Sequence, residues 1–469
     1  MMNYPALFEP IQLGNIELKN RIAMAPMNVG YTGPNGYHSD QSTAWYAMRA
    51  RGGFGLIITE CVVMNPHRWG GQQSLNPSLM IDERYYRYHS ELTEMIHHFS
   101  DCKICIQLSP GWGRQGHPHA ESRDCPAGAP SAIPMETDLR NLNKGWVRQI
   151  TRLAREAVGE EAVALVPDFD KVKEMNDEEY AAFKVEALGL LAMIAPEMGH
   201  VVVGDTPREL TKEEIVDLED RFATQTYASY KLGYDAVEVH APHGYLLHQF
   251  LSSRSNHRHD EYGGSLENRA RFLTNIIVKT REKIGPDKAF GVRLSGDELM
   301  PGGITHDEMK QVVTLCKDAG VNFINVSQGS YENPGAAFAP DGEDEFTRWA
   351  PGFKEASGGL PVITPGFINP EIAENAITSG KTDIISLGRQ SIADPFWPVK
   401  VKEGREKDIV KCIRCQRCYM DLMTANWCRC SVNPIVGKEK YYTELFLDTP
   451  KLKKKVDLFL KKAKDLPQI

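Results

Sequence analysis

The chain has 469 residues, 42% of them hydrophobic, so it can bury a large core and is predicted to hold one large domain and a smaller one. Its 54 basic and 62 acidic residues give a formal charge of -8, which argues against the basic surface of a nucleic-acid binder. The N-terminus lacks an export signal, and no stretch reaches the roughly 18 apolar residues of a membrane span. We therefore expect a cytoplasmic protein, with neither nucleic acid nor a membrane as partner.

Eight short runs rich in Val, Ile and Phe recur through the first four hundred residues, separated by segments long enough for helices. This alternation is typical of parallel β/α units. Eight units predict an α/β fold, a closed TIM (β/α)8 barrel over about residues 1–400, with its active site in the loops after the strands. The runs are residues 21–26, 54–60, 103–108, 235–240, 290–295, 323–328, 361–366 and 383–389. Polar or special residues lie at their ends: Asn28, Gln107, His240, Arg293, Gly366 and Arg389.

The third and fourth strand runs are separated by more than a hundred residues, far more than one crossover helix needs. Residues 146–158 and 177–198 within this connection have apolar side chains at helical spacing. We expect a helical insertion between strands 3 and 4, from about residue 138 to about residue 205, that caps the barrel mouth. A contact in a homo-oligomer, or a surface excursion without function, is the alternative role.

The segment 237–271 contains the densest group of reactive side chains. His240 ends a predicted strand, and His243 and Tyr245 follow within one turn, so all three can point into the barrel mouth. Two imidazoles that donate hydrogen bonds can hold and polarise a carbonyl oxygen, and a phenol can give a proton to carbon. The combination suits reduction of an activated C=C bond. Solvated or core histidines are the alternative, which the tight spacing disfavours.

Half of the ten cysteines lie within residues 412–430, and clustered thiols without an export signal are typical of metal ligands rather than disulfides. Cys412, Cys415 and Cys418 follow at two-residue intervals, so one loop can wrap three thiolates around a metal centre. Cys430 can supply the fourth ligand, with Cys428 as its rival. The sequence predicts a small metal-binding segment over about residues 401–440, with a structural zinc as the alternative to an iron–sulfur cluster.

The last residues, 441–469, are predicted to form an amphipathic helical tail. They are rich in Lys and have apolar side chains at helical intervals over 449–466. The apolar stripe is narrow, so we expect it to dock on the protein's own surface or on a partner rather than on lipid. No Gly-rich dinucleotide fingerprint occurs in this tail, and we therefore expect FAD and a dedicated NAD(P)H domain to be absent.

Taken together, these motifs resemble the old yellow enzyme family of FMN oxidoreductases. The likeness covers nearly all of the first 440 residues apart from the insertion. It is strongest to the iron–sulfur branch, which includes 2,4-dienoyl-CoA reductase, bile-acid and steroid enoate reductases and trimethylamine dehydrogenase. The resemblance implies FMN at the barrel mouth and a 4Fe-4S cluster in the cysteine segment. Its ligands would be Cys412, Cys415, Cys418 and Cys430, the last because it precedes a Ser-Val-Asn-Pro ending.

The opening LFEPIQLGNIELKNRIAMAPM resembles the family's start, which implies that Pro26, Met27 and Asn28 contact the isoalloxazine. The family more often has Thr or Cys where Asn28 stands, but an amide can donate to flavin N5 or O4. Gln107 matches the glutamine that grips the pyrimidine edge, and Cys61 is also assigned to FMN.

The remaining FMN contacts implied by the resemblance lie in the second half of the barrel. Arg293 matches the arginine near flavin N1 and O2, where a fixed cation stabilises the reduced flavin, and a barrel-lining ion pair is its alternative role. Gly366, Gly388 and Arg389 match the family's phosphate site, because glycine lets backbone N–H groups approach a phosphate and arginine adds charge.

The resemblance implies an FMN-dependent ene-reductase acting on an α,β-unsaturated carbonyl compound: an enone, an enoate or an enoyl thioester. In such an enzyme, His240 and His243 would bind the carbonyl oxygen of the substrate, and Tyr245 would protonate its α-carbon. An amine dehydrogenase or demethylase of the trimethylamine dehydrogenase type is an alternative, disfavoured because tyrosine is typical there at the position of His240. A non-catalytic electron-transfer subunit is another, disfavoured by the intact His-x-x-His-x-Tyr array.

Two routes for the electrons stay open at this point. A flavodoxin, a ferredoxin or a reductase subunit can dock near the cysteine segment and pass single electrons through the cluster to FMN. Alternatively, NAD(P)H transfers hydride directly to FMN at the barrel mouth, and the cluster is then largely structural.

Overall fold

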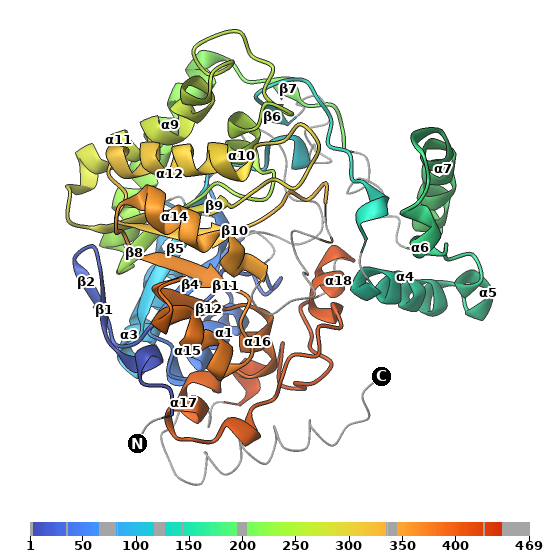
Figure 1. Ribbon diagram of the computed structural model, residues 1–469. Helices are drawn as coiled ribbons and strands as arrows, with labels where there is room; N and C mark the ends of the chain where they lie inside the picture. Colours follow the sequence, from blue (N-terminus) through green and yellow to red (C-terminus); the bar gives the residue numbers. More distant parts are fainter. Residues whose placement is uncertain are drawn as a thin grey trace.

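The computed structural model of the chain describes residues 3–33, 36–64, 81, 83–116, 127–142, 144–194, 204–333, 335, 345–424 and 427–442. Figure 1 shows a barrel with a helical extension on one side. The predicted tail helix over residues 449–466 lies outside the described residues, as does the end of the predicted insertion helix beyond residue 194. No helix of the described residues is long and apolar enough to cross a membrane.

Eight parallel strands close into a barrel, in which each strand pairs with the next and the last pairs with the first. Each predicted run overlaps one of them, so the predicted TIM barrel is confirmed. The strands are almost completely buried, which explains why they are continuous apolar runs rather than alternating ones. They are β3 (Ile22–Met24), β4 (Leu56–Val63), β5 (Lys103–Ser109), β8 (Ala236–His240), β9 (Ala289–Ser295), β10 (Phe323–Ser327), β11 (Val362–Pro365) and β12 (Ile384–Leu387).

One end of the barrel is closed by an N-terminal hairpin of β1 (Ile11–Leu13) and β2 (Ile16–Leu18). Leu13 and Leu18 of this hairpin are fully buried and belong to the same apolar cluster as strand residues such as Ile58 and Phe323. That cluster fills the amino-terminal half of the barrel. The carboxyl ends of the strands are therefore the expected place for a ligand site, as is usual for this architecture.

Helices surround the barrel (Figure 1). Thr211 and Thr305 begin two of them with capping boxes, in which the threonine and a glutamate three residues later satisfy each other's backbone N–H groups. The surrounding helices are α1 (Asp40–Arg51), α3 (Tyr86–Phe99), α9 (Lys212–Lys231), α10 (Leu246–Leu251), α11 (Leu266–Ile284), α12 (His306–Ala319), α14 (Ala350–Ser357), α15 (Pro370–Thr378), α16 (Arg389–Ala393) and α17 (Trp397–Lys402).

The long connection between β5 and β8 carries the helical extension. Its helices are α4 (Lys144–Ala157), α5 (Glu160–Val163), α6 (Phe169–Val172) and α7 (Asp177–Ile194), and the short strands β6 (Gly128–Ala129) and β7 (Arg208–Glu209) pair at its base. The predicted helices 146–158 and 177–198 correspond to α4 and α7. These helices share an apolar core with α18 (Arg417–Met423) of the cysteine segment, beside which α4 lies in Figure 1.

The cysteine segment is fixed to the barrel by buried hydrogen bonds. Cys412 donates its backbone N–H to the side chain of Gln390 over 2.9 Å, and Asn433 donates its side-chain amide to the carbonyl of Ile392 over 2.9 Å. Both acceptors lie on α16, directly after the last strand. The segment is thereby held next to the carboxyl ends of the strands.

Candidate active site

A cavity of about 290 Å³ lies at the carboxyl ends of the strands. Every residue predicted to act in catalysis or to contact FMN lines it, as do two of the four predicted cluster ligands, whereas Cys415 and Cys430 do not. The predicted residues that line the cavity are Pro26, Met27, Asn28, Cys61, Gln107, His240, His243, Tyr245, Arg293, Gly366, Gly388, Arg389, Cys412 and Cys418.

The three predicted catalytic side chains meet in this cavity. His240 ends β8, and Tyr245 immediately precedes α10. The ring of His240 lies 5.5 Å from that of His243 and 5.0 Å from that of Tyr245, measured between centroids. His243 has a backbone φ of +66°, a conformation that non-glycine residues adopt rarely and that is concentrated at functional sites.

The strained backbone of His243 is held by neighbouring loops. Its N–H donates to the hydroxyl of Ser295 over 3.2 Å. Its carbonyl oxygen accepts from the side chain of Gln115 over 3.0 Å and from the backbone of Tyr331 over 3.1 Å. Three strand ends therefore combine to fix the imidazole in one position.

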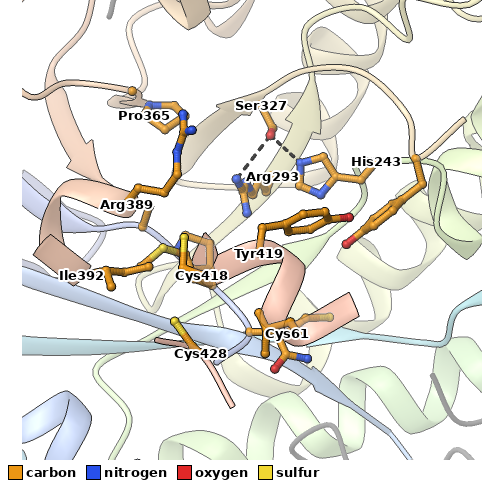
Figure 2. A pocket seen from close by; sticks show the side chains of 18 of the residues that line it. Cys61, His243, Arg293, Ser327, Pro365, Arg389, Ile392, Cys418, Tyr419 and Cys428 are labelled. Carbon is orange, nitrogen blue, oxygen red and sulfur yellow. Dashed lines mark hydrogen bonds between the residues drawn. The ribbon is translucent and has the colours of Figure 1, made fainter. Parts of the chain in front are cut away.

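Ser327, at the end of β10, connects two polar groups of the cavity. Its hydroxyl lies 2.6 Å from Nε2 of His243 and accepts a hydrogen bond from Arg293 over 3.2 Å (Figure 2). Because the guanidinium can only donate, the hydroxyl hydrogen of Ser327 is available to the imidazole. Arg293 thus orients His243 through one intervening side chain.

Both histidines are held in the neutral form. Burial lowers the pKa of His240 and of His243 well below the usual 6.5, and the nearby Arg293 cation lowers both further. A neutral imidazole carries one N–H donor and one acceptor nitrogen, so each ring can donate one hydrogen bond to a carbonyl oxygen.

Tyr245 is a proton donor at any ordinary pH. Burial raises the pKa of its phenol well above the usual 10. The charge of Tyr331 and a hydrogen bond with Tyr331 raise this pKa further. The ring packs 4.8 Å from Trp112 and 5.1 Å from Tyr331, again between centroids. The hydroxyl therefore stays protonated in a fixed aromatic setting.

Several groups around the cavity suit a ligand rich in acceptors. Nδ1 of His240, Nε of Arg293 and Nη1 of Arg389 are buried atoms without a hydrogen-bond partner among the described residues. The side-chain oxygen of Asn28 accepts from the backbone N–H of Gly30 over 3.0 Å, which leaves its amide donor for a ligand. Gly366 has a φ of +113°, which few other residues could adopt. This set of donors fits FMN.

A buried polar network around Glu238 holds Gln107, one of the predicted FMN contacts, and lies close to Arg293, another. Glu238 accepts from the side chain of Gln107 over 2.6 Å and from that of Asn325 over 2.8 Å. Burial raises the pKa of Glu238, and the Arg293 cation opposes that rise. Arg293 is thus close to a carboxyl, as the ion-pair alternative requires, and it faces the cavity as well.

The cysteine thiols lie close together beside the cavity. Burial raises the pKa of Cys418, as do the neighbouring thiols of Cys412 and Cys430, while Arg389 opposes the rise. Cys428 is fully buried, and its carbonyl accepts from the hydroxyl of Tyr31 over 2.6 Å. Among the described residues, no three His, Cys, Asp or Glu side chains converge closely enough to hold a single ion.

Sequence reasoning did not single out several residues that line the cavity. Trp112, Ser327 and Tyr331 follow or end predicted strands, so their position in the loops after β5 and β10 was a usable signal. Tyr419 comes from the cysteine segment, and nothing in its local pattern indicated a place in this cavity. The insertion was predicted to cap the barrel mouth, but its described part contributes no residue to the lining of the cavity. Helix α18, which packs against the insertion, lines the cavity instead.

Fold and cavity define a β/α-barrel protein whose site lies at the strand tips. The model of the NADH:flavin oxidoreductase / NADH oxidase family matches residues 6–172 and 174–408, so the chain belongs to this family. FMN is the typical cofactor of its members. The resemblance to old yellow enzymes that the motifs indicated is thereby confirmed.

Three relatives illustrate the similarity. An NADH oxidase from Thermoanaerobacter brockii is 32% identical over 454 residues, covering 95% of this chain and 58% of the relative. A cinnamate reductase from Clostridium sporogenes is 29% identical over 460 residues, covering 94% of this chain and 59% of the relative. The structure of a 2-naphthoyl-CoA reductase complex matches with a TM-score of 0.74 at 26% identity, covering 93% of this chain and 58% of that chain. The chain thus spans somewhat more than half the length of these relatives.

Proposed function

We propose that this chain reduces the C=C bond of an α,β-unsaturated carbonyl compound with FMN as cofactor. The observation that carries the proposal is the meeting of two neutral imidazoles and a protonated phenol in one cavity. Two of the relatives are named as reductases of cinnamate and of 2-naphthoyl-CoA. Both substrates are conjugated acyl compounds, which supports the proposed class of substrate.

In this proposal FMN is held by the groups that already face the cavity. Asn28 and Gln107 lie where amide groups can pair with the flavin edge, and Arg293 supplies the fixed cation. Gly366, Gly388 and Arg389 provide the phosphate end. When bound, reduced FMN supplies a hydride for the β-carbon of the substrate.

The residues of the chain then act on the opposite end of the double bond. His240 and His243 donate hydrogen bonds to the carbonyl oxygen, where negative charge develops during the reaction. Tyr245 gives its proton to the α-carbon, and solvent restores that proton afterwards. One hydride and one proton are added, so the C=C bond becomes a C–C single bond.

The test replaces Tyr245 with phenylalanine, which removes the hydroxyl and keeps the ring. Tyr245→Phe should leave flavin reduction unchanged and slow the reoxidation of reduced flavin by an enone at least about a hundredfold, the usual contribution of a positioned acid. Rapid mixing measures the two half-reactions separately. Equal loss in both halves would contradict the role of Tyr245. Turnover of a methylamine with no turnover of enones would favour the amine alternative.

We also propose that Cys412, Cys415, Cys418 and Cys430 hold a 4Fe-4S cluster. The thiol of Cys430 lies near those of Cys412 and Cys415, and the thiol of Cys428 lies near those of Cys418 and Cys430, so the choice of Cys430 rests on the Ser-Val-Asn-Pro sequence that follows it. A mononuclear zinc requires four sulfurs within about 2.3 Å of one ion. In a 4Fe-4S cluster each thiolate binds a different iron, and the two-residue intervals between Cys412, Cys415 and Cys418 allow one loop to supply three of them.

The surface around these thiols supports delivery of electrons by an acidic partner protein. Residues 411–442 contain six Lys or Arg side chains, in a chain whose formal charge is -8. Their two acids, Asp421 and Glu439, are both about 1% exposed and form ion pairs with Arg429 and Arg49. The exposed charge is therefore positive, as a docking surface for an acidic flavodoxin or ferredoxin requires. Direct hydride transfer from NAD(P)H is the competing route.

A further inference from the structure

Aromatic rings line the cavity beside its polar groups. In addition to Tyr245, the lining residues include Trp112, Tyr331, Phe346, Phe367 and Tyr419. Four of these five come from the barrel or its loops, and Tyr419 alone among them comes from the cysteine segment. The cavity therefore offers rings as well as donors to a ligand.

Tyr419 lies on α18, directly after the predicted cluster ligand Cys418. Leu422, three residues further, and Met423, four residues further, line the same cavity, so one face of α18 forms a wall. Figure 2 shows Tyr419 in the same cavity as His243 and Arg293. Helix α18 of the cysteine segment therefore forms part of the wall of the cavity at the carboxyl ends of the strands.

The insertion packs against α18 and supports this wall. The ring of Trp146 on α4 packs edge-on against that of Tyr419, with centroids 5.2 Å apart. Gln149 donates its side-chain amide to the carbonyl of Cys415 over 2.6 Å, and Met420 is fully buried in the core of the insertion. Side chains fixed in this way lose little freedom when a ligand binds, which favours selectivity.

We propose that Tyr419 is a specificity-determining residue that packs against a flat aryl group on the substrate. The inference rests on the proposed function, because an aryl group conjugated with the unsaturated carbonyl lies in one plane with it. Such a molecule can place its oxygen on His240 and His243 while its ring meets the ring of Tyr419. Aromatic pairs of this kind prefer offset or edge-on contacts and add to the affinity beyond simple burial.

The test compares an aryl ligand with an alkyl ligand in variants of Tyr419. Benzylacetone and methyl ethyl ketone are saturated ketones, so their binding to the holoenzyme is measured without turnover, from the perturbation of the flavin absorbance. Tyr419→Leu should weaken benzylacetone at least about tenfold, which corresponds to about 1.4 kcal/mol, and methyl ethyl ketone less than about twofold. Tyr419→Phe keeps the ring and should retain the affinity for both ketones.

Tyr441→Leu is the matched control, because Tyr441 follows directly after the cysteine segment and is 71% exposed. Equal weakening of both ketones by Tyr419→Leu, or no change in either, would overturn the inference. If Tyr419→Leu loses its cofactors, Leu422→Phe serves as the second variant, because it narrows the cavity beside Tyr419. It should abolish binding of benzylacetone and spare binding of methyl ethyl ketone. Unchanged binding of both ketones would again overturn the inference. Failure of the wild-type enzyme to reduce enones would refute the proposed function, whereas these binding ratios would still decide the role of Tyr419.

Discussion

Ser327 shows how one small side chain can set the chemistry of a larger one. Its hydroxyl accepts from Arg293 and lies within hydrogen-bond distance of Nε2 of His243. When the hydroxyl hydrogen points at Nε2, the imidazole proton resides on Nδ1, and the tautomer of a proposed catalytic histidine is fixed by its neighbour. Without this contact the neutral ring could exchange tautomers and lose its orientation.

We predict that Ser327→Ala weakens the proposed carbonyl binding without removing FMN. Two hydrogen bonds are lost, and each contributes about 0.5–1.5 kcal/mol, so kcat/KM for an enone should fall about tenfold or more. The measurement is steady-state kinetics at matched flavin content. Ser327→Thr keeps the hydroxyl and should remain close to the wild type. A Ser327→Ala enzyme with unchanged kcat/KM would contradict the role of this hydroxyl.

At the scale of elements, the insertion and the cysteine segment form one structural unit. Helices α4 and α7 share their apolar core with α18, and the ring contact of Trp146 with Tyr419 lies at the boundary of that core and the cavity. The insertion therefore reaches the site through α18. We expect the stability of the insertion to be coupled to that of the proposed cluster, because the α18 residues that contact the insertion lie between the cysteines in sequence.

We predict that Gln149→Ala loosens the cysteine segment and makes the cluster more labile. The hydrogen bond from Gln149 to the carbonyl of Cys415 fixes the loop between the second and third thiols, and its loss leaves that partly buried carbonyl without this donor. The broad brown absorbance and the bound iron should then be lost faster in air, while FMN is retained.

Arg148→Ala is the matched control for this experiment, because Arg148 is exposed on the same helix one residue away. It should lose iron at the wild-type rate. Equal rates in all three proteins would show that Gln149 does not support the cluster. Purified wild-type protein that contains zinc and lacks the brown absorbance would contradict the cluster itself.

At the scale of the whole molecule, the two ends of the barrel differ: one is filled by side chains and the other carries the cavity. The hairpin of β1 and β2 fills the amino-terminal end of the barrel, and the carboxyl ends of the strands carry the cavity, with the cysteine segment beside it. Cys412 and Cys418 line that cavity. Under the proposed partner route, an electron that enters through the cysteine segment would reach the cavity proposed to hold FMN directly from these thiols.

We predict that reduction of the flavin depends on the electron donor in a way that separates the two routes. Under partner delivery, NADH or NADPH alone should bleach the flavin slowly in stopped-flow mixing, and a reduced flavodoxin or ferredoxin should bleach it rapidly. Added salt should slow the partner reaction, because electrostatic steering is screened with a Debye length of about 8 Å at physiological ionic strength. Rapid bleaching by NADH or NADPH without a partner would refute partner delivery.

Much of the fold could be predicted from the sequence because strands buried on both faces must be apolar along their whole length. Residues 290–295 and 323–328 illustrate this, since each overlaps a fully buried strand. His240, His243 and Tyr245 could be placed together for a related reason: they follow one strand so closely that the chain cannot separate them. Arg293 lies two residues before the end of the next strand, β9.

The sequence by itself determined the barrel, the cluster of thiols and the polar residues at the strand ends, because these depend on local periodicity and short spacing. Only the tertiary structure decided that Ser327 bridges Arg293 and His243, that α18 lines the cavity whereas the described part of the insertion does not, and that Tyr419 faces the same space as the histidines. These contacts join segments far apart in the chain. Their geometry follows from how whole elements pack, which no local pattern of residues encodes.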